Sequence, residues 1–154
     1  MSVTYSRHRS NCCINYKDMQ IFGDYEAGTL YRLDMDTYTD GGYAIRRIRS
    51  AQHINVERLN IIFNSLELEF EAGTGTAVEL NGASALVALK WSDNSGVSWS
   101  GNHPASIGKT GEYKNRSLWR RLGITRDRVF HITITEPIKI VILAAYADVE
   151  KLAA

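Results

Sequence analysis

The segment ASALVALKWSDNSGVSW, residues 83–99, restricts the fold of this chain more than any other. Its first half, ASALVALKW, is mostly apolar and is interpreted as a strand whose successive side chains alternate between two faces. Asp93-Asn94-Ser95-Gly96 then forms a tight polar turn, because Asn and Gly tolerate positive φ and short polar side chains bond the amides of the turn. The two flanks are therefore expected to pair antiparallel.

Four residues of this segment, Ser92, Asn94, Gly96 and Trp99, have the spacing of an Asp-box hairpin. In that motif a polar loop folds over its own backbone and a tryptophan packs beneath it. Asn94 stands where the motif usually has aspartate. The segment resembles a structural element of β-propellers and sandwiches, which occurs in sialidases and in many proteins that are not enzymes. It predicts a structural hairpin in a β fold and says little about catalysis.

Other strand-like segments follow one another along the chain, separated by clusters of Gly, Asp and Asn. They predict an all-β fold, either an antiparallel β-sandwich or a partial propeller-like sheet domain. The expected elements are a hairpin over 11–22, strands over 29–34, 43–49, 60–71, 116–122, 128–135 and 138–146, and a long loop over 100–111.

Residues 60–71 alternate most cleanly, so one face of this strand is expected in the core and the other outside it. The predicted core face carries Leu66, Leu68 and Phe70. The predicted outer face carries the acidic residues Glu67, Glu69 and Glu71. Such an acidic row is expected either in water or against a basic partner.

The length of 154 residues predicts a single domain over residues 1–154, which can bury a core without disulfides or metals. Eighteen basic and seventeen acidic residues give a formal charge of +1, so no global field draws the protein to nucleic acid or membrane. Apolar runs are too short for a membrane span, and export by the secretory route is not expected. Cys12 and Cys13 are adjacent and would point to opposite faces of a strand, so no bridge between them is expected.

Metal and cofactor sites have little support in the sequence. The four histidines are widely spaced and form no metal-binding pattern; they are His8, His53, His103 and His131. Asp34, Asp36 and Asp40 resemble part of a calcium loop, but Ile45 stands where its bidentate Glu would be. We expect no catalytic residue, no metal and no cofactor, and the possibility of an ion at these three aspartates stays open.

Arginines gather in two parts of the chain, one around residues 46–49 and one around residues 116–128. Guanidinium groups bind phosphates and carboxylates alike, so this pattern suits nucleic acid or an acidic protein surface. Because the acidic row of residues 67–71 is a complement, subunit contact or pairing within the chain is the preferred interpretation. The candidate interface residues are Glu67, Glu69, Glu71, Arg116, Arg120, Arg121, Arg126 and Arg128.

Three segments together resemble the packaged-DNA stabilisation protein that forms the tail nozzle of short-tailed double-stranded DNA phages. They are residues 8–42, residues 87–100 and residues 106–148, and the last contains the specific runs GEYKNRSLWRRLG and RVFHITITEP. The resemblance implies a β-rich, propeller-containing protein that forms a ring on the portal and adaptor and keeps packaged DNA in the capsid. Members of this family are typically several times longer, and this chain resembles their C-terminal part.

We therefore expect a non-enzymatic structural protein of a phage virion, assembled in the host cytoplasm into a ring at the tail nozzle or head-to-tail junction. Its expected partners are further copies of itself, the portal, the adaptor, other tail proteins and, transiently, packaged double-stranded DNA, with no membrane contact. Two alternatives stay open: a carbohydrate-binding module, from the Asp-box-like hairpin, and a local nucleic-acid-binding module, from the arginines. A sialidase active site needs a full propeller, which 154 residues can hardly build.

Overall fold

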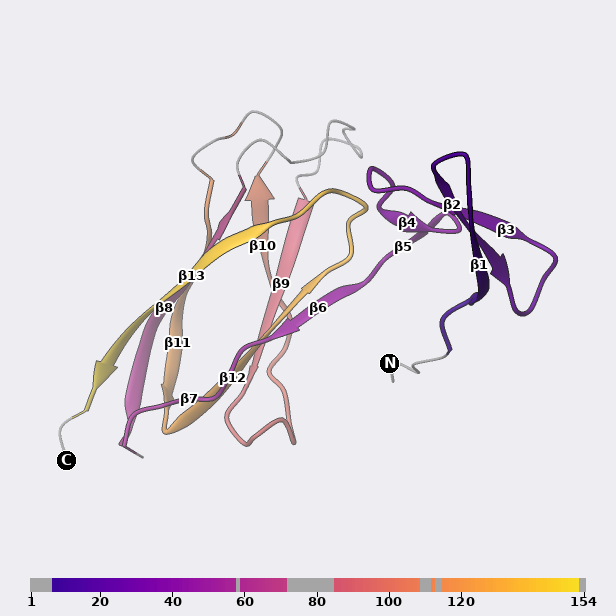
Figure 1. The fold of residues 1–154 in the computed structure, drawn as a ribbon. Helices are drawn as coiled ribbons and strands as arrows, with labels where there is room; N and C mark the ends of the chain where they lie inside the picture. The colour runs from indigo at the N-terminus through magenta and orange to yellow at the C-terminus, as the bar shows by residue number, and fades with distance from the viewer. Residues whose placement is uncertain (1–6, 58, 72–84, 109–111, 113–114, 153–154) are drawn as a thin grey trace. The chain divides into compact units, whose positions relative to one another are not determined.

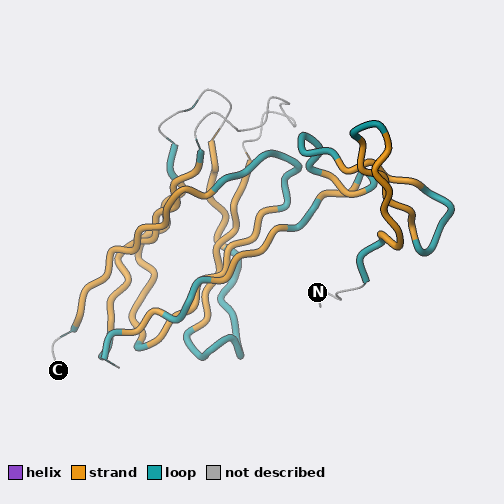
Figure 2. Tube along the Cα trace, in the orientation of Figure 1, coloured by secondary structure: helices purple, strands orange, loops and turns teal. Residues whose placement is uncertain are grey.

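The computed structural model describes residues 7–57, 59–71, 85–108, 112 and 115–152, and these residues form strands, turns and loops without a helix (Figures 1 and 2). This confirms the all-β prediction. Contacts divide the chain into two compact units, Met1–Tyr43 and Ala44–Ala154. The prediction of one virion domain over residues 1–154 stays a prediction.

The first unit contains a three-stranded antiparallel sheet in the order β1-β2-β3. Lys17 and Asp18 form its first turn with φ of 46° and 63°, the left-handed conformation that a two-residue hairpin turn needs. The hairpin expected over 11–22 is thereby confirmed. Gly41 and Gly42, also with positive φ, separate two short paired strands. The strands are β1 (Ser10–Tyr16), β2 (Met19–Asp24), β3 (Leu30–Leu33), β4 (Thr39–Asp40) and β5 (Tyr43–Ala44).

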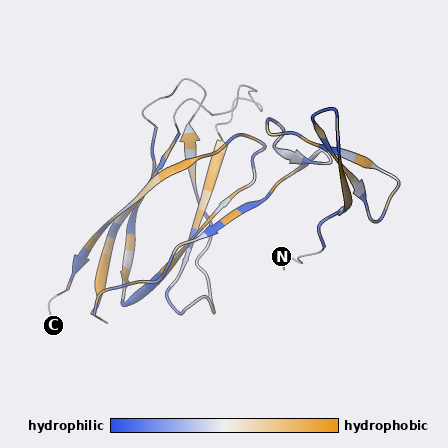
Figure 3. Ribbon diagram, in the orientation of Figure 1, coloured by the Kyte–Doolittle hydropathy of each residue, from blue (hydrophilic) through white to orange (hydrophobic). Residues whose placement is uncertain are grey.

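The second unit is a β-sandwich of two antiparallel sheets. One sheet has the order β10-β9-β12-β6, with β7 paired to β12, and the other has the order β11-β8-β13. Figure 3 shows apolar residues along β9 and the first half of β13, and hydrophilic residues at the end of β13. The strands are β6 (Arg47–Ser50), β7 (Ile54–Asn55), β8 (Ile61–Phe70), β9 (Ala85–Ser92), β10 (His103–Gly108), β11 (Ser117–Thr125), β12 (Asp127–Ile134) and β13 (Ile142–Lys151).

Side chains from both sheets form the core between them. Phe63 of β8 meets Phe130 of β12 edge to face, with ring centroids 5.7 Å apart. Val87 and Leu89 of β9 face the same core and have no exposed surface. This packing of two inner faces is what defines a sandwich.

The alternation expected along β8 is confirmed, with one irregularity. Leu66, Leu68 and Phe70 are buried in the core, as predicted. Asn64 has no partner in either neighbouring strand, which marks a β-bulge. The buried residues of β8 therefore have even numbers after the bulge and odd numbers before it, so Phe63 also lies in the core.

The prediction of a loop over residues 100–111 is wrong, because β10 lies within it and pairs with β9. Its sequence, HPASIG, has weak strand propensity and a proline, which is tolerated on an edge strand. Side chains of β11 bond the backbone of β10: Trp119 Nε1 donates to the carbonyl of His103 at 2.8 Å, and Ser117 Oγ donates to that of Ser106 at 2.8 Å. Tertiary contacts therefore stabilise a strand that local sequence does not predict.

The last strand begins at Ile142 rather than at the predicted residue 138. Residues 135–141 connect the two sheets instead. Arg47 of β6 donates to the carbonyls of Glu136 at 2.9 Å and Ile138 at 2.7 Å. These two bonds, together with Pro137, hold the apolar run out of strand pairing at its start.

Candidate functional site

The polar loop after β9 is held by its own side chains. The hydroxyl of Ser92, which is only 1% exposed, accepts the amide of Gly96 at 2.8 Å and donates to Asn94 Oδ1 at 2.9 Å. Asn94 Oδ1 also accepts the amide of Ser98, and its Nδ2 donates to the Ser98 hydroxyl, both at 2.8 Å. The asparagine thus spans the loop with an acceptor and a donor.

Trp99 packs against this loop and against the sheet below it. A Cβ atom on Gly96 would lie 3.7 Å from the Trp99 ring, and φ of Gly96 is +89°. The Trp99 ring meets that of His131 on β12 with centroids 5.1 Å apart, and Lys90 Nζ lies 5.0 Å from the Trp99 centroid. The structure therefore brings Ser92, Asn94, Gly96 and Trp99 together in one small assembly.

A buried arginine connects the same loop to the core. Arg128 is 2% exposed and makes a bidentate pair with Asp93, with Nε at 2.6 Å and Nη2 at 2.8 Å from the carboxylate oxygens. Its Nη1 donates to the carbonyl of Leu122 at 2.6 Å. The guanidinium carbon lies 4.7 Å from the Phe63 ring centroid and 5.3 Å from that of Trp91.

This environment removes Arg128 from the candidate interface residues. Its charge is paired and covered by its own chain, because a guanidinium can be buried only when its donors are satisfied. The spacing of the arginines in the sequence shows no difference between Arg128 and its neighbour Arg126. Arg126 is exposed and donates to Asn60 Oδ1 at 3.2 Å.

The outer face of the β11-β8-β13 sheet holds most of the remaining candidates. Arg116 Nη1 donates to Glu67 Oε1 at 3.0 Å, so this pair forms within the chain. The hydroxyl of Tyr146, on β13, lies 3.5 Å from Glu69 Oε2. Glu71 follows the end of β8 and pairs with Lys139 at 3.0 Å.

Arg120 and Arg121 remain exposed on β11 and make no ion pair with the residues that the structure describes. Arg121 has φ of +56° within the irregular stretch opposite Asn64. Ser65 is opposite Arg120 on one side and opposite Asp148 of β13 on the other. Nothing in the sequence indicated that Asp148 is a candidate interface residue, because only the strand register shows that it shares a row with Arg120.

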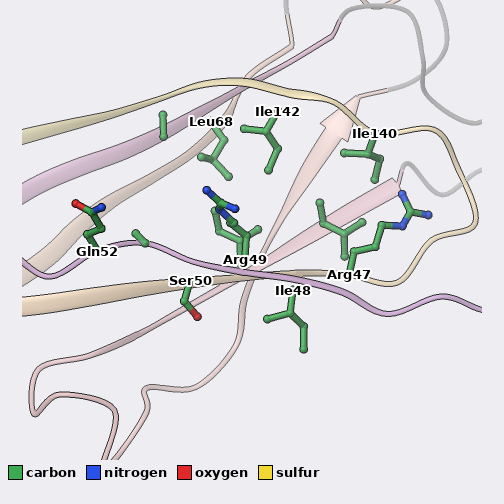
Figure 4. Close-up of a pocket in the computed structure, with 12 residues that line it drawn as sticks. Arg47, Ile48, Arg49, Ser50, Gln52, Leu68, Ile140 and Ile142 are labelled. Atoms are coloured by element: carbon green, nitrogen blue, oxygen red, sulfur yellow. The ribbon is translucent and has the colours of Figure 1, made fainter. Parts of the chain in front are cut away.

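A groove of about 680 Å³ opens between β6 and β13, on the side of the sandwich away from β10 and β11 (Figure 4). Its walls are mainly apolar and include Leu68, Ile140 and Ile142. Figure 4 shows the Arg49 side chain pointing from β6 toward Leu68. Arg49 was noted in the sequence as part of a basic cluster, but nothing there indicated that it faces an apolar groove.

Of the three aspartates considered for calcium binding, Asp34 has partners within the chain. Asp34 accepts the amide of Asp36 at 3.0 Å and pairs with Arg32 at 2.7 Å, and these contacts, the amide first, lower the pKa of Asp34. Among the described residues, no group of three or more His, Cys, Asp or Glu side chains could hold a metal ion. Cys12 and Cys13 are both free and exposed.

The histidines also have local partners. His53 pairs with Asp127 at 2.9 Å, His103 stacks on Trp91 with centroids 4.6 Å apart, and His8 bonds Ser10 at 2.8 Å. His131 Nδ1 lies 2.9 Å from the Ser50 hydroxyl, while its Nε2 is buried without a partner among the described groups. Burial, followed by the charges of Lys90 and Arg46, lowers the pKa of His131.

The second unit of the chain is similar to a known protein family. The model of the family described as Bacteriophage P22 Gp10, beta-sandwich, matches residues 46–150, which is more than half of the chain. The matched range coincides with the sandwich unit. Comparison with curated proteins finds no significant match. In the described part of the chain, no helix has the length and apolar character that crossing a membrane requires.

Proposed function

The chain belongs to the family of the bacteriophage P22 Gp10 β-sandwich, a family of phage structural proteins, and on this premise we propose that it is a component of the virion tail. The proposed place is the tail nozzle or head-to-tail junction, and the proposed action is mechanical rather than enzymatic. The observation that carries the proposal is the family match over residues 46–150, together with a β-sandwich in that range.

Assembly into a ring is the second element of the proposal. A closed ring needs a heterologous interface, in which one surface of a subunit meets a different surface of the next. The sandwich has two unlike sides. Side chains of Ser117 and Trp119 join β11 to β10 on one side, whereas a groove separates β13 from β6 on the other. Unlike sides of one subunit are what a head-to-tail ring requires.

Retention of packaged DNA is the third element. Double-stranded DNA carries a dense negative charge, so a strongly basic channel would bind it and resist its passage. The formal charge of +1 and the pairing of Arg116 and Arg128 within the chain leave little excess positive charge for such binding. These features suit a channel element that confines DNA without holding it. The portal and adaptor are the proposed neighbours, as the family resemblance implies.

The native mass of the purified protein tests this function. It would be measured by light scattering or native mass spectrometry, alone and with a phage portal–adaptor complex, with an unrelated β-sandwich of similar size as the control. We expect either a closed ring of several copies or monomers that assemble only on the complex. A protein that stays monomeric and does not bind the complex, as expected of the control, would contradict the proposal.

A glycan-binding function has one observation in its favour. A hollow of about 340 Å³ beside the polar loop is lined by two tryptophans and by polar side chains; its lining residues are Trp91, Asp93, Asn94, Ser98, Trp99 and Ser100. Asp93 and Asn94 are, however, already bonded within the chain. Thermal stabilisation by saccharides would support this function. A steep dependence of DNA affinity on salt would instead support a nucleic-acid-binding module, and a flat dependence would exclude it.

A further inference from the structure

On the outer face of the β11-β8-β13 sheet, the edge at β11 carries a basic residue and the edge at β13 carries an acidic one. Residues directly opposite each other in an antiparallel pair share a face, so the register defines rows across the sheet. One row runs Arg120, Ser65, Asp148 from β11 to β13. Each row end lies on an edge strand, and the neutral Ser65 separates the two charges.

The next row has apolar groups at both ends. It runs Leu118, Glu67, Tyr146, and the exposed fractions of Leu118 and Tyr146 are 36% and 57%. An exposed tyrosine and leucine on edge strands are surfaces that association would bury. The two rows together therefore present an acid and an aromatic ring on β13, and a base and an aliphatic group on β11.

Both edge strands are long enough to dock a neighbour. β11 has nine residues and β13 has ten, and among the described residues the backbone of each pairs on one side only, with β8. Long edge strands with exposed apolar residues are templates for association unless they are covered. Because β11 and β13 both run antiparallel to β8, they run parallel to each other. In a ring whose copies are related by rotation about an axis parallel to the strands, β13 of one copy would thus lie beside β11 of the next copy. The two strands would run in the same direction.

We propose that the edge at β13 of one copy docks beside the edge at β11 of a second copy, with Asp148 next to Arg120 and Tyr146 next to Leu118. This inference rests on the ring assembly of the proposed function and names its contact. Because β13 differs from β11, the contact is heterologous and repeats around a ring.

Charge complementarity decides the occupant of this edge. Asp148 and Glu150 on β13 make no ion pair within the described part of the chain, and neither does Arg120 on β11. Opposite charges on adjacent strands stabilise their pairing, and like charges oppose it. A second copy supplies the required base in the same row as the acid, without a shift in register.

The test is a charge exchange between the two edges. Arg120→Glu and Asp148→Lys are made separately and together, and the native mass of each variant is measured under the condition in which the natural protein assembles. We expect each single variant to lose the ring and the double variant to regain it, since the exchanged charges attract again. Arg46→Glu, a reversal at an exposed arginine outside this sheet, is the matched control and should leave the ring intact.

A cooperative thermal unfolding transition, measured for each variant, shows that the variant is folded. Single variants that assemble like the natural protein would overturn the proposed contact while leaving the ring itself in place. A double variant that unfolds like the natural protein but stays monomeric would also overturn it. Failure of the natural protein to assemble, alone or on the portal–adaptor complex, would instead contradict the proposed function.

Discussion

The two units of this protein differ in where they place their apolar side chains. All core residues that the structure describes belong to the sandwich, from Ile61 to Ile138. In the described part of the first unit, by contrast, Ile14, Leu30 and Met35 are 62%, 72% and 84% exposed. A small sheet needs a covered apolar face for independent stability, so the difference indicates that the sandwich supplies the cooperative stability of the chain.

Polar contacts hold the first unit instead. Asp24 accepts the amide of Glu26 at 2.8 Å and the hydroxyl of Tyr31 at 3.0 Å. The Glu26 amide is the main cause that lowers the pKa of Asp24. Residues 1–43 also hold four basic and six acidic residues, whereas residues 44–154 hold fourteen basic and eleven acidic ones. The small net charge of the chain is thus the sum of a net negative charge in the first unit and a net positive charge in the second.

Truncation of a large apolar side chain in each unit should show the contrast most strongly. Phe63→Ala removes a fully buried ring from between the two sheets and should lower the free energy of unfolding by about 3–5 kcal/mol. Leu30→Ala, at an exposed position of the first unit, should change it little. Urea unfolding of both variants measures this, and equal losses would contradict the contrast.

Removal of an aspartate that pairs with an arginine should give the next largest difference between the units. Asp93→Ala leaves the buried guanidinium of Arg128 without its carboxylate, and water can replace it only in part. We expect a loss of about 1–3 kcal/mol in the free energy of unfolding. Asp34→Ala breaks the exposed pair with Arg32 and should have no measurable effect on that free energy. A larger loss for Asp34→Ala would show that the first unit contributes to global stability.

Removal of the side chain that spans the polar loop should have a smaller effect. Asn94→Ala deletes the acceptor of the Ser98 amide and the donor to its hydroxyl, at a cost of about 1 kcal/mol. Asn94→Asp keeps the acceptor and restores the usual residue of the motif, so most of the stability should remain. Thermal unfolding compares the two variants, and equal losses would show that the amide donor matters more than the acceptor.

Acidification should produce the smallest effect, through His131. Its pKa is lower in the folded state than the ordinary value of about 6.5, so the unfolded chain binds more protons between the two values. Stability is therefore complete above about pH 6.5 and decreases as the pH falls through the folded pKa. The unfolding temperature should fall slightly between pH 7.5 and 5.5, and less so in His131→Gln. An identical slope in that variant would assign the dependence to other groups.

Local patterns predicted those parts of the fold in which each residue follows its own period or turn chemistry. The alternation of Leu66, Leu68 and Phe70 predicted a buried face of β8, and the polar turn after Ser92 predicted a reversal of the chain. Neither the strand at His103 nor the late start of β13 has such a pattern. Both depend on bonds from residues distant in the sequence, such as Trp119 and Arg47.

The sequence by itself determined the all-β class, the hairpin turns and the phage structural family, because strand period, turn residues and family motifs are local properties of the chain. Only the tertiary structure decided which charges are available to a partner. It buries Arg128 with Asp93, pairs Arg116 with Glu67, and leaves Arg120 in one row with Asp148. The physical reason is that the environment of a charge depends on strand register and on the packing of two sheets, which bring together residues far apart in the sequence.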